Sequence, residues 1–156
     1  MKFKQFKIRG ATALALLVGA AFSVNTARAN AAIDIVATLP ELAAITREVG
    51  GNKVSVYSVA KPNSDYHTFE PRSSDVQRVA QADLVVRTGM KLEMWMDSII
   101  NAARTPKAIQ YVNCSLGIRR MDVPNEQISG ASGDVHVDGN PHFYYDPVYG
   151  KFIARN

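Results

Sequence analysis

Two of the three histidines in this chain lie in short segments bounded by prolines. His67 lies within the segment 62–71, and His142 directly follows Pro141. Because proline fixes its own backbone, a histidine in such a loop has a restricted reach, as a metal ligand requires. Imidazole is a common ligand of zinc and similar borderline metals. We therefore predict that His67 and His142 bind one metal ion, and the alternative for each is a loop histidine that hydrogen-bonds only to backbone.

Two further residues near these segments carry groups that metal sites use. His136 lies in the polar stretch 134–138, where a solvated loop histidine is favoured over an auxiliary ligand. Glu70 follows His67 by three residues. Its carboxylate is favoured as a hydrogen-bond acceptor for a ligand, or as a charge at a helix start, over a direct ligand.

Catalytic motifs are absent from the sequence. It has no Gly-x-Ser-x-Gly turn, no phosphate-binding loop and no His-Glu-x-x-His pair. Met90, Met94 and Met96 suggest soft Cu(I) ligands, but their spacing fits core packing better. Cys114 is the single cysteine and is predicted to be a small buried apolar residue. We therefore expect no enzymatic activity.

The histidine segments lie between elements that alternate between strand and helix. Apolar runs rich in β-branched residues predict strands, and apolar residues at helical spacing predict helices. This alternation predicts an α/β fold with a parallel sheet flanked by helices, and His67 then lies at the carboxyl ends of the strands, where such sheets bind ligands. The predicted strands are 33–38, 54–59, 84–86 and 108–112, and the predicted helices are 40–49, one that Ser73 or Ser74 caps, and 92–103.

The last part of the chain is less regular until its final residues. Residues 122–139 contain Pro, Gly, Ser, Asn and Asp with little apolar periodicity, which predicts a long surface loop. Asp146 followed by Pro147 is typical of a helix start, with Asp as the cap and Pro at the first helical position.

The first 29 residues have the pattern of a secretory signal peptide. Four basic residues precede an apolar run that is too short to span a membrane, and Ala27-Arg28-Ala29 is typical of a cleavage site. No cysteine lies near that point, so we expect a periplasmic or other extracytoplasmic protein without a lipid anchor or membrane span. Cleavage leaves 13 basic and 14 acidic residues, a net charge of −1, which argues against nucleic-acid binding.

Five segments together resemble the periplasmic metal-binding proteins of zinc and manganese ABC transporters. The similar segments are 35–40, 65–71, 74–76, 82–86 and 139–147, and with the signal peptide the resemblance covers essentially the whole mature chain. The segments around His67 and His142 are the most specific to that family.

The resemblance implies a fold, a function and a partner. Members have two α/β lobes joined by a long helix and carry a divalent metal ion, Zn²⁺ or Mn²⁺, to a membrane permease. The first lobe supplies two histidines, which match His67 and His142, and the second lobe supplies the other ligands. By this comparison, residues 30–145 form the first lobe, residues 146–156 begin the linking helix, and the second lobe is absent, as in a truncated product.

The metal and the biological role are left with alternatives. Two imidazoles favour Zn²⁺ over Mn²⁺ or Fe²⁺ as the transported ion, although a histidine-rich loop of the kind that many zinc-binding members carry is not present. The alternative role is an adhesin-like interaction protein with the same fold, which would function in cell adhesion.

Overall fold

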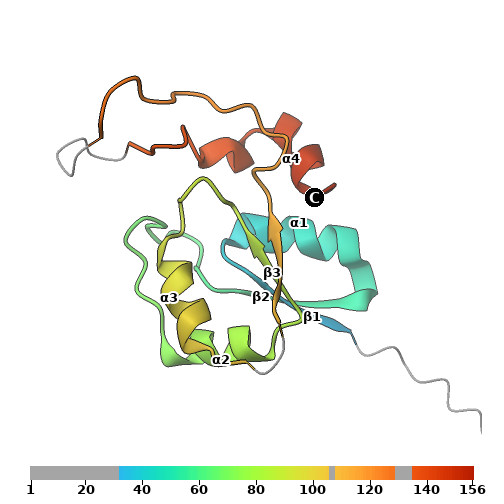
Figure 1. Ribbon diagram of the computed structural model, residues 1–156. Helices are drawn as coiled ribbons and strands as arrows, with labels where there is room; N and C mark the ends of the chain where they lie inside the picture. Colours follow the sequence, from blue (N-terminus) through green and yellow to red (C-terminus); the bar gives the residue numbers. More distant parts are fainter. Residues whose placement is uncertain (1–31, 106–107, 129–134) are drawn as a thin grey trace, which may run out of the picture.

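The computed structural model describes residues 32–105, 108–128 and 135–156. Four strands form one parallel sheet in the spatial order β2-β1-β3-β4 (Figure 1). The predicted α/β class with a parallel sheet flanked by helices is therefore confirmed, whereas the predicted signal peptide, 1–29, lies outside the described residues. The strands are β1 (Ile33–Ala37), β2 (Val54–Ser58), β3 (Leu84–Arg87) and β4 (Gln110–Asn113).

The α-helices of the described residues cover both faces of this sheet. Strand residues alternate between the two faces, as a pleated backbone requires, and both faces are apolar because both are buried. Ile35 and Ala37 pack in one core cluster with residues of α1 (Pro40–Gly50) and α4 (Pro147–Ile153). Val36 and Val85 pack in the other cluster with residues of α2 (Ser73–Gln81) and α3 (Trp95–Ala102).

The start of α3 differs from the sequence prediction. We expected a helix from Leu92, but α3 begins at Trp95. Met90 and Lys91 have φ values of 52° and 58°, which a right-handed helix does not allow. The Leu92 N–H instead donates to the Gly89 carbonyl (3.2 Å) and closes a turn. The helix therefore begins three residues later than predicted.

The cap of α2 also differs from the prediction. Arg72, rather than Ser73 or Ser74, is the N-cap residue, and its backbone N–H donates to the Asp75 carboxylate (2.7 Å). Asp75 is fully buried and also accepts a hydrogen bond from the Tyr57 hydroxyl (2.7 Å). The buried carboxylate therefore links the first turn of α2 to β2.

The predicted helix start near the end of the chain is confirmed. The Asp146 carboxylate accepts a hydrogen bond from the Val148 N–H (2.8 Å), and Pro147 occupies the first turn of α4. The further expectation that this segment links two lobes stays a prediction. Among the helices of the described residues, none is both long and apolar enough to cross a membrane.

Candidate metal centre

His67 lies in the loop between β2 and α2, at the carboxyl ends of the strands. Its backbone N–H donates to Asp65 Oδ1 (2.9 Å), and the Thr68 hydroxyl donates to Asp65 Oδ2 (2.8 Å). Asp and Asn often close such turns with the backbone two residues ahead. The His67 N–H, followed by the Thr68 hydroxyl, lowers the pKa of Asp65, so this turn holds an ionised carboxylate.

Aromatic residues on both sides of His67 fasten its loop to the helices. The Tyr66 carbonyl accepts a hydrogen bond from Trp95 Nε1 (2.7 Å), and the Phe69 ring packs 4.7 Å from the Trp95 ring. The buried Tyr66 hydroxyl donates to Glu41 on α1 (3.2 Å). Burial, and then the Glu41 charge, raises the pKa of Tyr66 to about 12, so this hydroxyl stays a donor at neutral pH. His67 is therefore held between α1 and α3.

His142 opens a short 3-10 helix, η3 (His142–Tyr145), which packs beside α4. Its backbone N–H donates to Asn140 Oδ1 (3.0 Å), the same turn that Asp65 makes before His67. The His142 Nδ1 atom lies 3.1 Å from the Tyr144 hydroxyl. When Nδ1 carries the proton and donates to that oxygen, Nε2 keeps the lone pair that a metal ion would bind.

Tyr144 is suited to stay uncharged in this position. The side chain is buried, and burial, followed by the neighbouring Tyr145, raises the pKa of the Tyr144 hydroxyl well above its usual range. The Tyr144 ring also packs 6.4 Å from the Tyr66 ring. The two loops that carry His67 and His142 therefore share an aromatic contact.

His136 joins the other two histidines, although the sequence favoured a solvated loop residue. Its ring centroid lies 5.0 Å from that of His67 and 6.3 Å from that of His142. The reason lies in long-range backbone contacts that composition does not reveal. The Gly139 N–H donates to the His136 carbonyl (3.0 Å), and the next N–H, of Asn140, donates to the Met121 carbonyl (2.8 Å).

Gly139 is the residue that lets this segment turn. Its φ of +92° lies in the region that favours glycine, and a Cβ there would collide with the Met121 carbonyl. Arg120 and Asp138 add an ion pair (3.2 Å) beside the same contact. The chain between His136 and His142 is therefore folded against residues 120–121, and this fold brings both rings to one place.

The three imidazoles form one group of donor atoms. One ring nitrogen from each histidine can be chosen so that all three lie within 4.8 Å of one another, and all three side chains are half-buried. The rings of His67 and His142, the two predicted ligands, are 5.2 Å apart. Three neutral imidazoles around a fourth, open position are a donor set that zinc uses in proteins.

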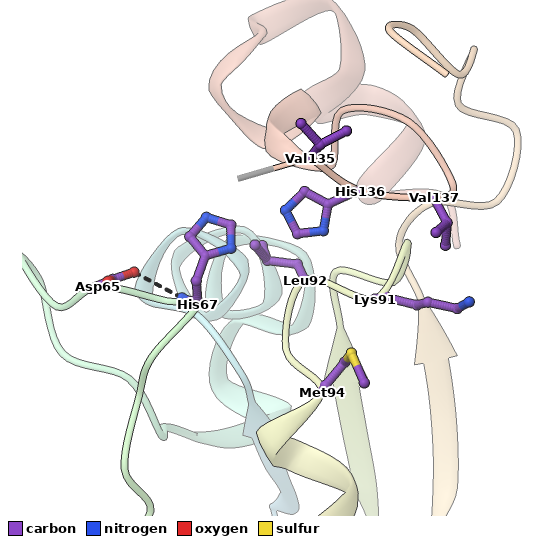
Figure 2. Close-up of a pocket in the computed structure, with 8 residues that line it drawn as sticks. All are labelled: Asp65, His67, Lys91, Leu92, Met94, Val135, His136 and Val137. Atoms are coloured by element: carbon purple, nitrogen blue, oxygen red, sulfur yellow. Dashed lines mark hydrogen bonds between the residues drawn. The ribbon is translucent and has the colours of Figure 1, made fainter. Parts of the chain in front are cut away.

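Two hollows flank the histidines. A larger one, of about 850 Å³, lies beside His67 and His136 and is lined also by Leu92, Met94 and Lys91. Figure 2 shows the rings of His67 and His136 near each other above these side chains. A smaller one, of about 340 Å³, lies beside His67 and His142 and is lined by Tyr144, Tyr145 and Glu41. His67 therefore lines both hollows, and each hollow also reaches one of the other two histidines.

Other candidates from the sequence lie apart from this group. Glu70 is exposed and is not a member of the donor cluster found among the described residues, so its role as an acceptor for a ligand stays a prediction. Met90 and Met96 are buried, in agreement with core packing, whereas the prediction is wrong for Met94, which is 64% exposed. Cys114 is fully buried, and burial, followed by the charge of Glu93, raises its pKa to about 12, as suits an inert core thiol.

Comparison with known proteins gives one family over most of the chain. The family described as zinc-uptake complex component A, periplasmic, matches residues 35–156. The chain is 26% identical over 148 residues to a metal ABC transporter substrate-binding lipoprotein of Lactococcus lactis, covering 92% of this chain and 45% of the relative. It is 26% identical over 144 residues to the manganese ABC transporter substrate-binding lipoprotein PsaA of Streptococcus anginosus, covering 90% and 44%. The chain thus spans just under half the length of these relatives.

Solved structures share the fold at lower sequence identity. A crystal structure of ZnuA superposes with a TM-score of 0.65 at 22% identity, over 80% of this chain and 44% of that one. A manganese-bound periplasmic metal-binding protein from Candidatus Liberibacter asiaticus superposes with a TM-score of 0.63 at 19% identity, over 78% and 41%. At these identities the superposition is evidence for the fold alone.

One expectation about localisation is wrong. We expected a mature chain without a lipid anchor, but the relatives in Lactococcus lactis, Streptococcus anginosus and Streptococcus mutans are named lipoproteins. The expectation came only from the lack of a cysteine near the predicted cleavage point. That reasoning depends on residues at one end of the chain, and an absence there does not exclude an anchor.

Proposed function

This chain belongs to the family of periplasmic component A of zinc-uptake complexes, and from that membership we propose that it captures a divalent metal ion outside the cytoplasm for an ABC importer. The match over residues 35–156 bears out the resemblance inferred from the sequence. The matched relatives are named as substrate-binding proteins of transporters, which are carriers and not enzymes.

The observation that carries the proposal is the meeting of His67 and His142. Their rings lie 5.2 Å apart although 74 residues separate them in the chain. Each backbone N–H is held by an Asp or Asn two residues earlier, so the backbone that carries each imidazole is held in place before any ion arrives. Such preorganisation favours binding because little side-chain freedom is lost when the ion binds.

We favour Zn²⁺ as the cargo. Imidazole nitrogen suits zinc, whereas manganese prefers sites rich in oxygen ligands. The family description names zinc uptake, and this agrees with the donor atoms of the site. Mn²⁺ is the second candidate because several relatives, among them PsaA of Streptococcus anginosus, are named manganese transporter proteins. Fe²⁺ and an adhesin-like role stay hypotheses.

The implied partner is the permease of an ABC transporter. A substrate-binding protein releases its ion to such a permease, and the names of the relatives support this role. The chain spans 45% of the length of the Lactococcus lactis relative. Delivery of the ion to a permease by this chain is therefore a proposal drawn from longer proteins.

Titration of the purified chain with zinc against a chromophoric chelator tests this function. We expect one zinc ion per chain, and a loss of affinity of at least about tenfold in His67→Ala and in His142→Ala, because each removes a direct ligand. Asn125→Ala, at an exposed loop position, is the matched control and should bind as the wild type does. Zinc binding that persists unchanged in both histidine variants would contradict the proposal.

A further inference from the structure

We propose that His136 is a third metal ligand, so that one lobe alone offers a three-imidazole site that selects zinc over manganese. The inference rests on the proposed function, in which only His67 and His142 bind the ion. It adds a ligand that the family resemblance does not supply, and it changes how much of the coordination shell this lobe provides.

The distances between the donor atoms are the first observation that supports His136 as a ligand. Three nitrogens bound to tetrahedral zinc at 2.0–2.1 Å lie about 3.4 Å from one another. In the structure the three chosen nitrogens lie within 4.8 Å of one another. Closing that gap needs a movement of about 1.5 Å, which small rotations of half-buried rings supply. His136 therefore needs no rearrangement of the fold to reach the ion.

The backbone of the His136 segment is the second observation. The hydrogen bond from the Asn140 N–H to the Met121 carbonyl and the turn at Gly139 hold this segment beside His142. The ion pair between Arg120 and Asp138 lies in the same contact, although its arginine is exposed and it adds little stability. Contacts within the protein therefore hold the backbone of His136 in this position without a bound metal ion.

The composition of the cluster is the third observation, and it supports the selection of zinc over manganese. The group holds three imidazoles and no carboxylate among the described residues. Affinity for nitrogen ligands rises from Mn²⁺ towards the later metals of the series, and an all-nitrogen set therefore favours Zn²⁺ over Mn²⁺. The fourth position is left for water or for a ligand from elsewhere, which suits an ion that has to be released.

The experiment compares zinc and manganese affinities of the purified chain with those of three single variants. Zinc is titrated against a chelator into each of three variants, His67→Ala, His136→Ala and His142→Ala. Val137→Ala is the matched control. Val137 is exposed, lies next to His136 in the chain and lines the same hollow. We expect His136→Ala to weaken zinc binding by about 100-fold or more, beyond the range of residues that only support a ligand. Manganese binding should be weak in the wild type and should change little.

The outcomes separate this inference from the proposed function. If His136→Ala binds zinc as the wild type does, whereas the other two histidine variants lose binding, the third ligand is refuted and the proposed function stands. If Val137→Ala loses as much affinity as His136→Ala, the segment acts by its shape, and the inference is again overturned. If all three histidine variants bind normally, both proposals fail.

A spectroscopic measurement on the unsubstituted chain tests the same inference without relying on the folding of any variant. Co²⁺ replaces zinc and reports coordination number through its visible absorption. Three imidazoles and one further ligand predict intense bands of a four-coordinate ion. Weak bands of a six-coordinate ion would overturn the inference without any variant.

Discussion

Asp65 and Asn140 form the same kind of turn at two distant points of the chain. Each lies two residues before a histidine, and each accepts a hydrogen bond from that histidine's backbone N–H, at 2.9 Å and 3.0 Å. The repeated turn fixes the direction in which His67 and His142 leave the backbone. We infer that these two acceptors are positioning residues for the metal site.

Asn140→Ala tests this role at the residue scale. The change removes the acceptor for the His142 N–H and the contact from Asn140 Nδ2 to Asp122 (3.3 Å). Because the histidine itself remains, we expect zinc affinity to fall by about tenfold, as for groups that orient a ligand, with one ion still bound per chain. Asn125→Ala should leave the affinity unchanged. An Asn140→Ala protein with wild-type affinity and unchanged stoichiometry would show that the turn is dispensable.

The sequence was sufficient to predict two of the three clustered histidines. His67 and His142 each follow a proline-bounded pattern that is visible in a window of ten residues. His136 has no such local pattern, because its position depends on a hydrogen bond from Asn140 to Met121, a residue 19 positions earlier. Contacts of this range follow from the fold and cannot be inferred from the composition of the loop.

At the scale of elements, one buried carboxylate connects the ends of the two central strands. Glu93 lies in the loop after β3, and its Oε1 accepts hydrogen bonds from the Thr38 hydroxyl (3.0 Å) after β1 and from the Thr88 backbone N–H. The residue is 1% exposed. This loop also carries Lys91, Leu92 and Met94 to the larger hollow beside the histidines. Glu93 therefore holds one wall of the site against the sheet.

Replacing Glu93 should affect stability according to whether the acceptor is kept. Glu93→Ala leaves the buried Thr88 N–H without an acceptor and opens a cavity, which should cost about 2–4 kcal/mol of unfolding free energy. Glu93→Gln keeps an acceptor of the same shape and should cost less than about 1 kcal/mol. Urea unfolding followed by circular dichroism measures both. Equal stabilities of the two variants would mean that the hydrogen bonds at Oε1 do not hold this loop.

The elements themselves were largely predictable, and their errors have local causes. The four strands and their parallel arrangement follow from apolar runs that alternate with helical patterns. The start of α3 was misplaced because Leu92 fits the apolar spacing of the helix, whereas Met90 and Lys91 adopt positive φ. The cap of α2 was misplaced because the buried Asp75, and not a serine, binds the N-terminal N–H. Both errors lie where a side chain or a turn overrides the periodicity.

At the scale of the whole molecule, the histidine cluster lies at the carboxyl edge of a parallel sheet, where open α/β sheets commonly bind ligands. The loop after β2 and the segment before α4 bring the rings of His67 and His142 to within 5.2 Å of each other at this edge. Two hollows beside the cluster leave an ion accessible from solvent. The fold therefore holds the donor atoms close together while it leaves a route for the ion to enter and leave, as a carrier requires.

X-ray absorption spectroscopy of the zinc-loaded chain at one equivalent of metal measures this arrangement most directly. The account predicts a four-coordinate ion with three imidazole nitrogens at about 2.0–2.1 Å, and the loss of one imidazole from the fit in His136→Ala. A shell of oxygen atoms with one imidazole or none would contradict the account, because the three rings would then converge without sharing an ion.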